Sequence, residues 1–459
     1  MSHTISHSIK SEIKNILSLG VPLVTSQLIY ACSGFIGTAL VAELGDDALA
    51  ASVLVSTIWM TLSVLFFGVL NSVGVLVSHE YGAKNYKSIS TIMGQAYLLG
   101  IMIIVAMIFI LSFMPLFLRF SAQPPAVLKL ASEYMRALLW TMPGLIILII
   151  DEQFLAGINR AKIVLRISIM VVPIEIVLIY LLIFGKFGLP ACGVAGVGYG
   201  FAVTYSITAI GLTLYLLRAK YYRPFNVFNG FTKINFHYLK ELISIGLPIG
   251  FMHIIEVSTF AIATYWIAQF GTTMLAAHQI VFQYFGFAIT LVFAMSQAVT
   301  VRIGHAVGEK DLTGVRYTFY IGMLVNFACV LLIAIAFYLI PTFFLRLDID
   351  VNALKNAALI RDTSTLLAIS GIVLLFDNFR IIGFGALRGL KDTRFPMYAS
   401  FIGFWLIGLN IAYLLGFVFH QQGVGIWYGL ATGIASGAAM VLLRLRYLLK
   451  RIDLNKFAT

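Results

Sequence analysis

Charged residues are scarce in this chain. Asp, Glu, Lys and Arg make up 11% of its 459 residues, whereas a soluble globular domain carries about 25%. Hydrophobic residues reach 60%, above the roughly 45–50% of soluble domains. This composition excludes a protein whose main solvent is water and predicts an integral membrane protein.

Motifs of several other functions are also missing. The three cysteines, Cys32, Cys192 and Cys329, lie far apart and form no CxxC pair, which excludes a redox or zinc motif. No GxxxxGK[ST] motif occurs, so we expect no direct use of ATP by this chain. No nucleophile or three-ligand metal pattern is present, so an intramembrane enzyme built on His253 and Glu256 is the weakest alternative. We expect no enzyme and no cofactor.

Long apolar runs dominate the sequence. A helix needs about 20 apolar residues to cross the ~30 Å hydrocarbon layer, and about twelve such runs occur. They are continuously apolar, whereas the strands of a membrane barrel alternate. The predicted fold class is therefore an all-α integral membrane protein with about twelve transmembrane helices. The predicted spans are 18–42, 48–77, 90–116, 130–156, 167–185, 193–216, 242–269, 274–301, 318–344, 364–387, 397–418 and 424–443.

The net charge of +12 follows from where the basic residues lie. Most Lys and Arg residues fall in alternate connections, and the positive-inside rule assigns those connections to the cytoplasm. This predicts a multi-pass protein of the cell (inner) membrane with both termini cytoplasmic. The basic residues then need no nucleic-acid partner. Those of the last helix are expected to set the topology, and the less favoured alternative is a contact with anionic lipid headgroups. We expect a monomer.

The two halves of the chain repeat one pattern. Gly20 and Pro22 recur as Gly246 and Pro248, and the same offset pairs His79 with His305 and further positions without a gap. Each half holds an even number of spans, so the repeats are parallel, and such transporters bind substrate between them. We predict an N-terminal six-helix lobe (1–216), a cytoplasmic linker (217–241) and a C-terminal six-helix lobe (242–459).

Six charged residues are predicted to lie at membrane depth, apart from Glu133 and Arg136, which fall near the outer end of the span 130–156. A charge at the bilayer centre costs at least ~2.5 kcal/mol, so each is a candidate functional residue. Acids outnumber bases there, which favours cations such as protons, Na⁺ or organic amines over anionic cargo. The six residues are Asp151, Glu152, Glu175, Glu256, Asp377 and Arg380.

Two of these acids carry the central hypothesis. Glu256 has no cationic neighbour one turn away along its own helix, and we expect it to take up the coupling proton. Asp377 precedes Arg380 by three residues, a spacing that places both on one helix face. They form a self-neutralising pair, or Asp377 exchanges Arg380 for a proton or a cargo cation. In the repeat, Arg380 corresponds to Asp151 of the first half. A second hypothesis is a salt bridge between these two residues.

Neighbouring residues complete the candidate substrate cleft. His253 lies one turn before Glu256, where a hydrogen-bonded histidine is favoured over a metal ligand because no third ligand accompanies it. His278, in LAAHQ, is expected to satisfy packing polar groups. Aromatic side chains such as Tyr30 would stack on a planar cation. The cleft candidates are Tyr30, Glu152, His253, His278 and Arg380, and the coupling candidates are Glu256, Asp377, Glu175 and Asp151.

Six segments in this order are similar to one family. They are IFGKFGLPACGVAGVGYG (183–200), GLPIGFMHIIEVSTFA (246–261), LAAHQ (275–279), VRIGHAVGEKD (301–311), ALRGLKDT (386–393) and GFWLIGL (403–409). Over nearly its whole length the chain resembles the multidrug and toxic compound extrusion (MATE) family, especially its NorM-like branch. The resemblance implies V-shaped lobes that export cationic amphiphilic drugs and dyes in exchange for H⁺ or Na⁺. It also implies an ion site at Glu256 and Asp377.

The sequence departs from the family pattern at three positions. Gly37 stands in GFIGT where the family usually carries an aspartate, Glu175 where relatives often have asparagine, and Val373 where relatives place a tyrosine. These departures count against a Na⁺ site of the usual composition and favour protons, with Glu175 replacing the acid missing at Gly37. The alternative is a lipid-linked saccharide flippase. Such a protein needs cationic residues in its cleft, and a single buried Arg380 against five acids argues against it.

Overall fold

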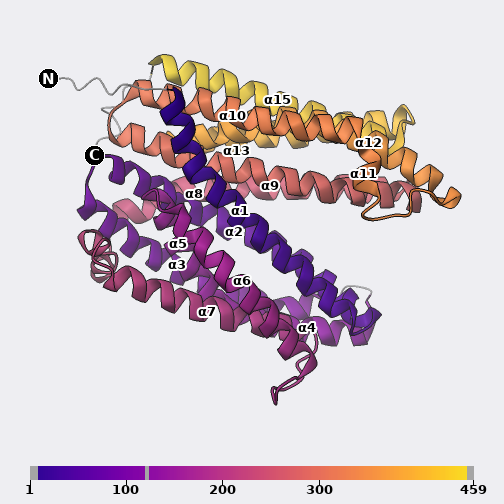
Figure 1. The fold of residues 1–459 in the computed structure, drawn as a ribbon, viewed down its shortest axis with the longest axis horizontal. Coiled ribbons are helices and arrows are strands. Elements are labelled where there is room, and N and C mark those ends of the chain that lie inside the picture. Colours follow the sequence, from indigo (N-terminus) through magenta and orange to yellow (C-terminus); the bar gives the residue numbers. More distant parts are fainter. Residues whose placement is uncertain (1–8, 119–122, 452–459) are drawn as a thin grey trace. The chain divides into compact units, whose positions relative to one another are not determined.

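The chain folds almost entirely into helices. A computed structural model describes residues 9–118 and 123–451, and this part of the chain contains no β-strand (Figure 1). Eleven of its helices are long and apolar enough to cross a membrane, and a bent pair of shorter helices makes a twelfth span. The prediction of an all-α membrane protein is confirmed. Both termini lie outside the described residues, so their cytoplasmic location stays a prediction.

Contacts divide the chain into two units. The N-terminal unit is Thr25–Leu247, and the C-terminal unit combines Met1–Val24 with Pro248–Thr459. Two long helices, α1 (Ile9–Ala42) and α8 (Phe236–Ala268), therefore contribute to both units. The lobes proposed from the repeat, 1–216 and 242–459, differ from this division at the start of both helices and in the linker.

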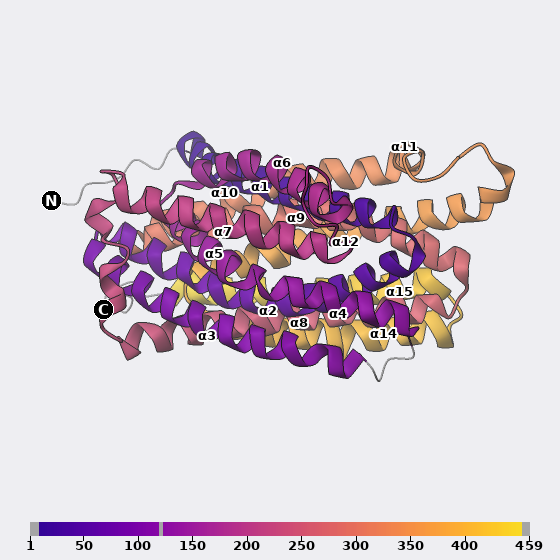
Figure 2. The same cartoon turned by 90° about the horizontal axis from the view of Figure 1, so that it is seen from below.

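In the N-terminal unit, long helices pack side by side along most of their length (Figures 1 and 2). A core cluster that includes Val41, Val55 and Tyr134 lies between them. Besides parts of α1 and α8, the unit contains α2 (Asp46–Gly82), α3 (Tyr86–Leu118), α4 (Pro125–Leu139), α5 (Thr141–Gly157), α6 (Ala161–Phe184), α7 (Ala195–Arg218), and the short helices η1 (Arg223–Phe225) and η2 (Asn229–Thr232).

The predicted span 130–156 is broken at Trp140. Helices α4 and α5 meet there at 47°. Proline has no backbone N–H, so Pro143 cannot donate a hydrogen bond to the carbonyl of Leu139, and its ring disfavours a continuous helix. The predicted span is present, as a bent pair of helices rather than one continuous helix.

The segment after α7 docks on α3. The backbones of Gly94 and Gly230 approach so closely that a Cβ on Gly94 would lie 2.1 Å from the Gly230 carbonyl carbon. Gln95 Nε2 donates to the carbonyls of Gly230 (3.3 Å) and Lys233 (2.9 Å). The proposed linker is thus bound to the N-terminal unit.

The C-terminal unit is built around α12 (Ala357–Gly389), which packs against α9 (Thr272–Gly308), α10 (Leu312–Leu339) and α15 (Gln422–Arg451). Glycines recur at every fourth position of α15, and a Cβ on Gly429 would lie 2.2 Å from Ala412 Cα. Small residues at this spacing let helices approach closely in membranes. The other elements are α11 (Pro341–Leu345), η3 (Leu354–Asn356), α13 (Arg394–Ser400), the π-helical η4 (Phe401–Gly408) and η5 (Leu414–Val418), and α14 (Leu409–Tyr413).

Candidate functional site

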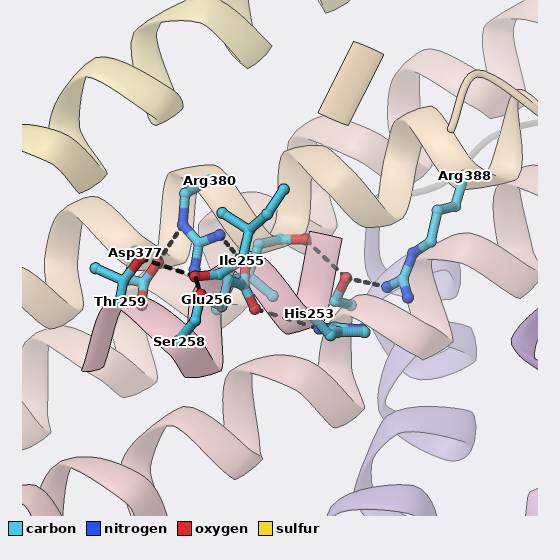
Figure 3. A network of polar contacts seen from close by, with 10 residues as sticks. His253, Ile255, Glu256, Ser258, Thr259, Asp377, Arg380 and Arg388 are labelled. Carbon is cyan, nitrogen blue, oxygen red and sulfur yellow. Dashed lines mark hydrogen bonds and ion pairs between the residues drawn. The ribbon is translucent and has the colours of Figure 1, made fainter. Parts of the chain in front are cut away.

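A buried ion network joins α8 to α12 in the C-terminal unit (Figure 3). Arg380 donates from Nε to Asp377 Oδ1 at 2.5 Å and from a terminal nitrogen to Glu256 Oε1. The three side chains are almost completely buried. The predicted contact between Asp377 and Arg380 is confirmed. The contact between Arg380 and Glu256, which lie on different helices, was not predicted.

Glu256 therefore has the cationic partner that its own helix does not provide. The guanidinium carbon of Arg380 also lies 4.8 Å from the centre of the Phe404 ring and 5.1 Å from that of Phe384. Gly437 faces the Arg380 side chain, and a Cβ there would lie 3.3 Å from Arg380 Cδ. A buried charge needs partners of this kind. The cation beside Glu256 comes from α12, which the spacing along α8 does not reveal.

His253 extends the network by one turn. Its Nδ1 lies 3.2 Å from Glu256 Oε2, as the spacing along α8 predicted. The described residues contain no group of three His, Cys, Asp or Glu side chains arranged to hold a metal ion. Counting His253 as neutral, two carboxylates share one guanidinium. The network therefore carries one negative charge that Arg380 does not neutralise.

Arg388 is a second buried cation on α12, two turns beyond Arg380 (Figure 3). One of its terminal nitrogens donates to Ser296 Oγ at 2.8 Å, and Ser296 donates in turn to the carbonyl of Ile381 at 2.7 Å. Arg388 directly follows the predicted span 364–387, so the positive-inside rule assigns it to the cytoplasmic side. Its side chain instead lies along the buried side of α12.

A second acidic cluster lies in the N-terminal unit. Tyr30 of α1 donates to Glu152 Oε1 of α5 at 3.0 Å, and Ser33 of α1 donates to Glu175 Oε1 of α6. Glu175 is completely buried, and the Tyr205 hydroxyl group lies close to its carboxyl group. No Lys, Arg or His side chain among residues 9–118 and 123–451 forms an ion pair with either acid. This cluster therefore differs from the one in the C-terminal unit.

Gly37 lies one turn beyond Ser33 on α1 and leaves space. A Cβ at this position would meet only Val197 Cγ1, at 3.9 Å. Open space thus stands where the resemblance leads us to expect an acid, whereas the carboxylate of Glu175 contacts the same helix through Ser33.

Asp151 belongs to a different environment from its neighbour Glu152. Successive residues on a helix point about 100° apart. Asp151 therefore faces α3 and α7, where Tyr97 donates to Oδ1 and Thr213 to Oδ2 at 3.1 Å. The ring of Tyr97 stacks on Phe228 of the linker, with the ring centres 5.0 Å apart. Asp151 therefore has partners within its own unit, as Arg380 has in Asp377 and Glu256, and the pairing of Arg380 with Asp151 stays a hypothesis.

His278 is a packing residue. Trp427 Nε1 donates to His278 Nδ1 at 3.2 Å, so the imidazole proton must lie on Nε2, which is 2.9 Å from Thr264 Oγ1. Thr264 donates in turn to the carbonyl of Phe260 at 2.8 Å. Both ring nitrogens of this completely buried neutral histidine are satisfied. This agrees with the packing role that the sequence favoured.

Comparison with known proteins assigns this chain to a family. The family model described as MatE matches residues 22–181 and 248–414. A probable multidrug resistance protein NorM of Pseudomonas aeruginosa is 32% identical over 428 residues, which cover 93% of this chain and 88% of the relative. A protein of the same description from Rhizobium meliloti is 31% identical over 440 residues, covering 95% and 94%.

Solved structures agree on the fold. A structure described as MATE in the bent conformation superposes with a TM-score of 0.87 at 18% identity, covering 98% of this chain and 97% of that chain. The Vibrio cholerae MATE transporter VcmN in the bent form gives a TM-score of 0.86 at 17% identity, covering 96% and 98%. The chain is therefore a transporter rather than an enzyme, and it belongs to the MATE family, among its NorM-like members.

Proposed function

We propose that this protein exports cationic amphiphilic compounds across the cell membrane in exchange for protons. The relatives are described as multidrug resistance proteins, which supports small drugs and dyes as cargo. In this proposal the lobes 1–216 and 242–459 are the moving parts, and the linker 217–241 joins them. The coupling residues are Glu256, Asp377 and Glu175.

The observation that carries the proposal is the excess of buried acids. Around Arg380, two carboxylates share one cation, so an arriving amine finds one uncompensated negative charge. When a proton takes that charge, nothing remains to hold the amine. Proton binding and cargo binding therefore exclude each other, which is the requirement for exchange.

The arrangement favours protons over Na⁺ in both units. The Arg380 guanidinium already occupies the position between Glu256 and Asp377 that a Na⁺ ion would need. In the N-terminal unit the acid expected at Gly37 is absent. Glu175 accepts from Ser33 and lies beside the Tyr205 hydroxyl group, with no Lys, Arg or His paired to it among the described residues, and such a carboxylate can accept a proton without further ligands. We therefore assign the proton-carrying role first to Glu175.

The buried Arg388 is one observation in favour of the alternative function, a lipid-linked saccharide flippase. This buried guanidinium donates to a serine hydroxyl rather than to an acid, so two buried cations, not one, are available to an anionic cargo. Because Arg380 is compensated by two acids, the acidic excess still favours cationic cargo.

Ethidium efflux from membrane vesicles tests the proposal. We expect an imposed pH gradient to drive efflux and an imposed Na⁺ gradient to fail. Glu175→Gln, Glu256→Gln and Asp377→Asn should each abolish efflux, whereas Glu43→Gln, in the exposed turn between α1 and α2, should not. Efflux driven by Na⁺ alone would refute proton coupling. Unchanged efflux in all three variants would refute the site. Loss of saccharide-lipid transport in Arg388→Gln, with ethidium efflux intact, would support the flippase.

A further inference from the structure

An apolar groove runs between α6 and α7 in the N-terminal unit. It encloses about 540 Å³, within the range of roughly 300–1,000 Å³ of small-molecule sites. Its walls are exposed: Met170 is 68% and Ile207 is 64% accessible. The residues along its length are Met170, Ile174 and Leu178 of α6 and Ile207, Gly211 and Tyr215 of α7.

One row of α6 residues forms the long wall of this groove. Lys162 and Arg166 precede Met170, Ile174 and Leu178 at intervals of four, so the five form one ridge that winds slowly around the helix. Its last four members line the groove, and Lys162 lies at the basic end of the ridge. The first two are basic and the last three apolar. From Arg166 to Leu178 the helix rises about 18 Å at 1.5 Å per residue, close to the ~15 Å depth of one leaflet of a ~30 Å hydrocarbon layer.

Positive charge gathers at one end of the groove. Arg166 is the one charged residue of the described groove wall. Helices α6 and α7 run antiparallel, so the first residues of α6 lie beside the last residues of α7. The exposed Lys162, Arg218 and Lys220 are therefore at the same end of the groove. Between 153 and 240 the only acid is Glu175, which is buried against Ser33. This end is one of those that the positive-inside rule assigns to the cytoplasm.

We propose that this groove binds one anionic phospholipid of the cytoplasmic leaflet. Arg166 and Lys162 hold the headgroup phosphate, and an acyl chain lies along Met170, Ile174 and Leu178. Basic pockets between membrane helices at the cytoplasmic face bind anionic headgroups in this way. A cationic drug would meet Arg166 with the wrong sign of charge, so the groove is distinct from the cargo site. The inference does not depend on the direction or coupling of transport.

Gly211 provides a way to fill the groove without disturbing the fold. A Cβ at this position would meet no atom within 4 Å, so Gly211→Leu adds a side chain where the lipid would lie. Gly286→Leu in α9 is the matched control, because a Cβ there also meets nothing within 4 Å. For the charge, Arg166→Gln is matched by Arg136→Gln, an exposed arginine of α4.

Native mass spectrometry of the full chain in detergent provides the measurement, with phosphatidylglycerol and phosphatidylethanolamine as probes. We expect one phosphatidylglycerol to bind at least about fivefold more tightly than phosphatidylethanolamine, the effect of one basic residue near the headgroups. Arg166→Gln should lower the affinity for phosphatidylglycerol about fivefold, and Gly211→Leu should abolish binding. The controls Arg136→Gln and Gly286→Leu should bind as the wild type does.

Three outcomes would overturn the proposal. They are equal affinity for the two lipids, unchanged phosphatidylglycerol binding in Gly211→Leu, and displacement of the bound lipid by ethidium, which would make the groove a cargo site. Because efflux is not measured, failure of the proposed transport function leaves this test intact.

Discussion

Replacement of Arg380 with glutamine should destabilise the C-terminal unit far more than replacement of either acid that it binds. In the wild type, one guanidinium faces two carboxylates, a net charge of about −1 with His253 neutral. Arg380→Gln leaves both carboxylates without a cation. Glu256→Gln and Asp377→Asn each leave a balanced pair of one acid and one arginine.

The size of the difference follows from burial. Arg380, Glu256 and Asp377 are at most 7% exposed, and removing one partner of such a buried pair costs about 3–5 kcal/mol. Glu256→Gln keeps an oxygen that can still accept from Arg380, so it should cost about 1 kcal/mol. At roughly 2–4 °C per kcal/mol for a unit of this size, Arg380→Gln should lower Tm by about 6–20 °C and Glu256→Gln by about 2–4 °C.

Thermal unfolding of the purified full chain in detergent measures these shifts. The double variant Glu256→Gln/Arg380→Gln should recover part of the loss, because one fewer carboxylate remains unpaired. The deficit of Arg380→Gln should also shrink as the pH falls, since a protonated carboxyl group needs no counter-charge. If either acid variant lowers Tm as much as Arg380→Gln, or if the double variant is less stable than Arg380→Gln, the charge balance described here is wrong.

Three further changes probe other contacts. Glu12 accepts from Arg302 Nη2 at 2.8 Å, so Glu12→Gln should cost about 2 kcal/mol in thermal unfolding, and a loss no larger than that of the exposed Lys14→Gln would contradict this. Gly94→Ala places a Cβ 2.1 Å from the Gly230 backbone and should speed tryptic cleavage of the linker, whereas Gly211→Ala should not. His278→Ala leaves the indole N–H of Trp427 without its acceptor and should cost about 1–3 kcal/mol. A change in the pH dependence of efflux in this last variant would instead give His278 a role in coupling.

Local contacts within a helix could be predicted from the sequence. Asp377 and Arg380, like His253 and Glu256, are three residues apart, and the helical period places such residues on one face in any membrane helix. The length of each span was predictable for a similar reason, because the hydrocarbon thickness sets it. These predictions need no knowledge of which helices are neighbours.

Contacts between helices could not be predicted. Glu256 meets Arg380, Tyr30 meets Glu152 and Ser33 meets Glu175 only because each helix has a particular rotation and depth. Spans that are apolar on every side do not reveal that rotation, since the lipid-facing and protein-facing sides look alike. Hydroxyl groups give little signal, because serine and threonine in helices usually bond to their own backbone.

The break at Trp140 is an intermediate case. Pro143 is visible in the sequence, and a proline in a helix interior predicts a bend or a break. Pro22, Pro173 and Pro248, however, lie inside helices that continue as single elements. Proline alone therefore marks places where a break is allowed, and the surrounding packing decides whether one occurs.

The sharing of α1 and α8 between the two units has a consequence for the order of synthesis. The first turns of α1 leave the ribosome early, but their partners Arg302 and Thr318 are made much later. Until Arg302 and Thr318 have been made, the Glu12 carboxylate lacks both of these hydrogen-bond donors. Conversely, the first turns of α8 join a unit that is already complete in sequence, as the close contact of Gly246 with Val69 shows. A cut in the linker would separate each unit from part of a helix that packs in it. The N-terminal product would lack the first turns of α8, and the C-terminal product would lack the first turns of α1. We therefore expect neither half to assemble fully without the other.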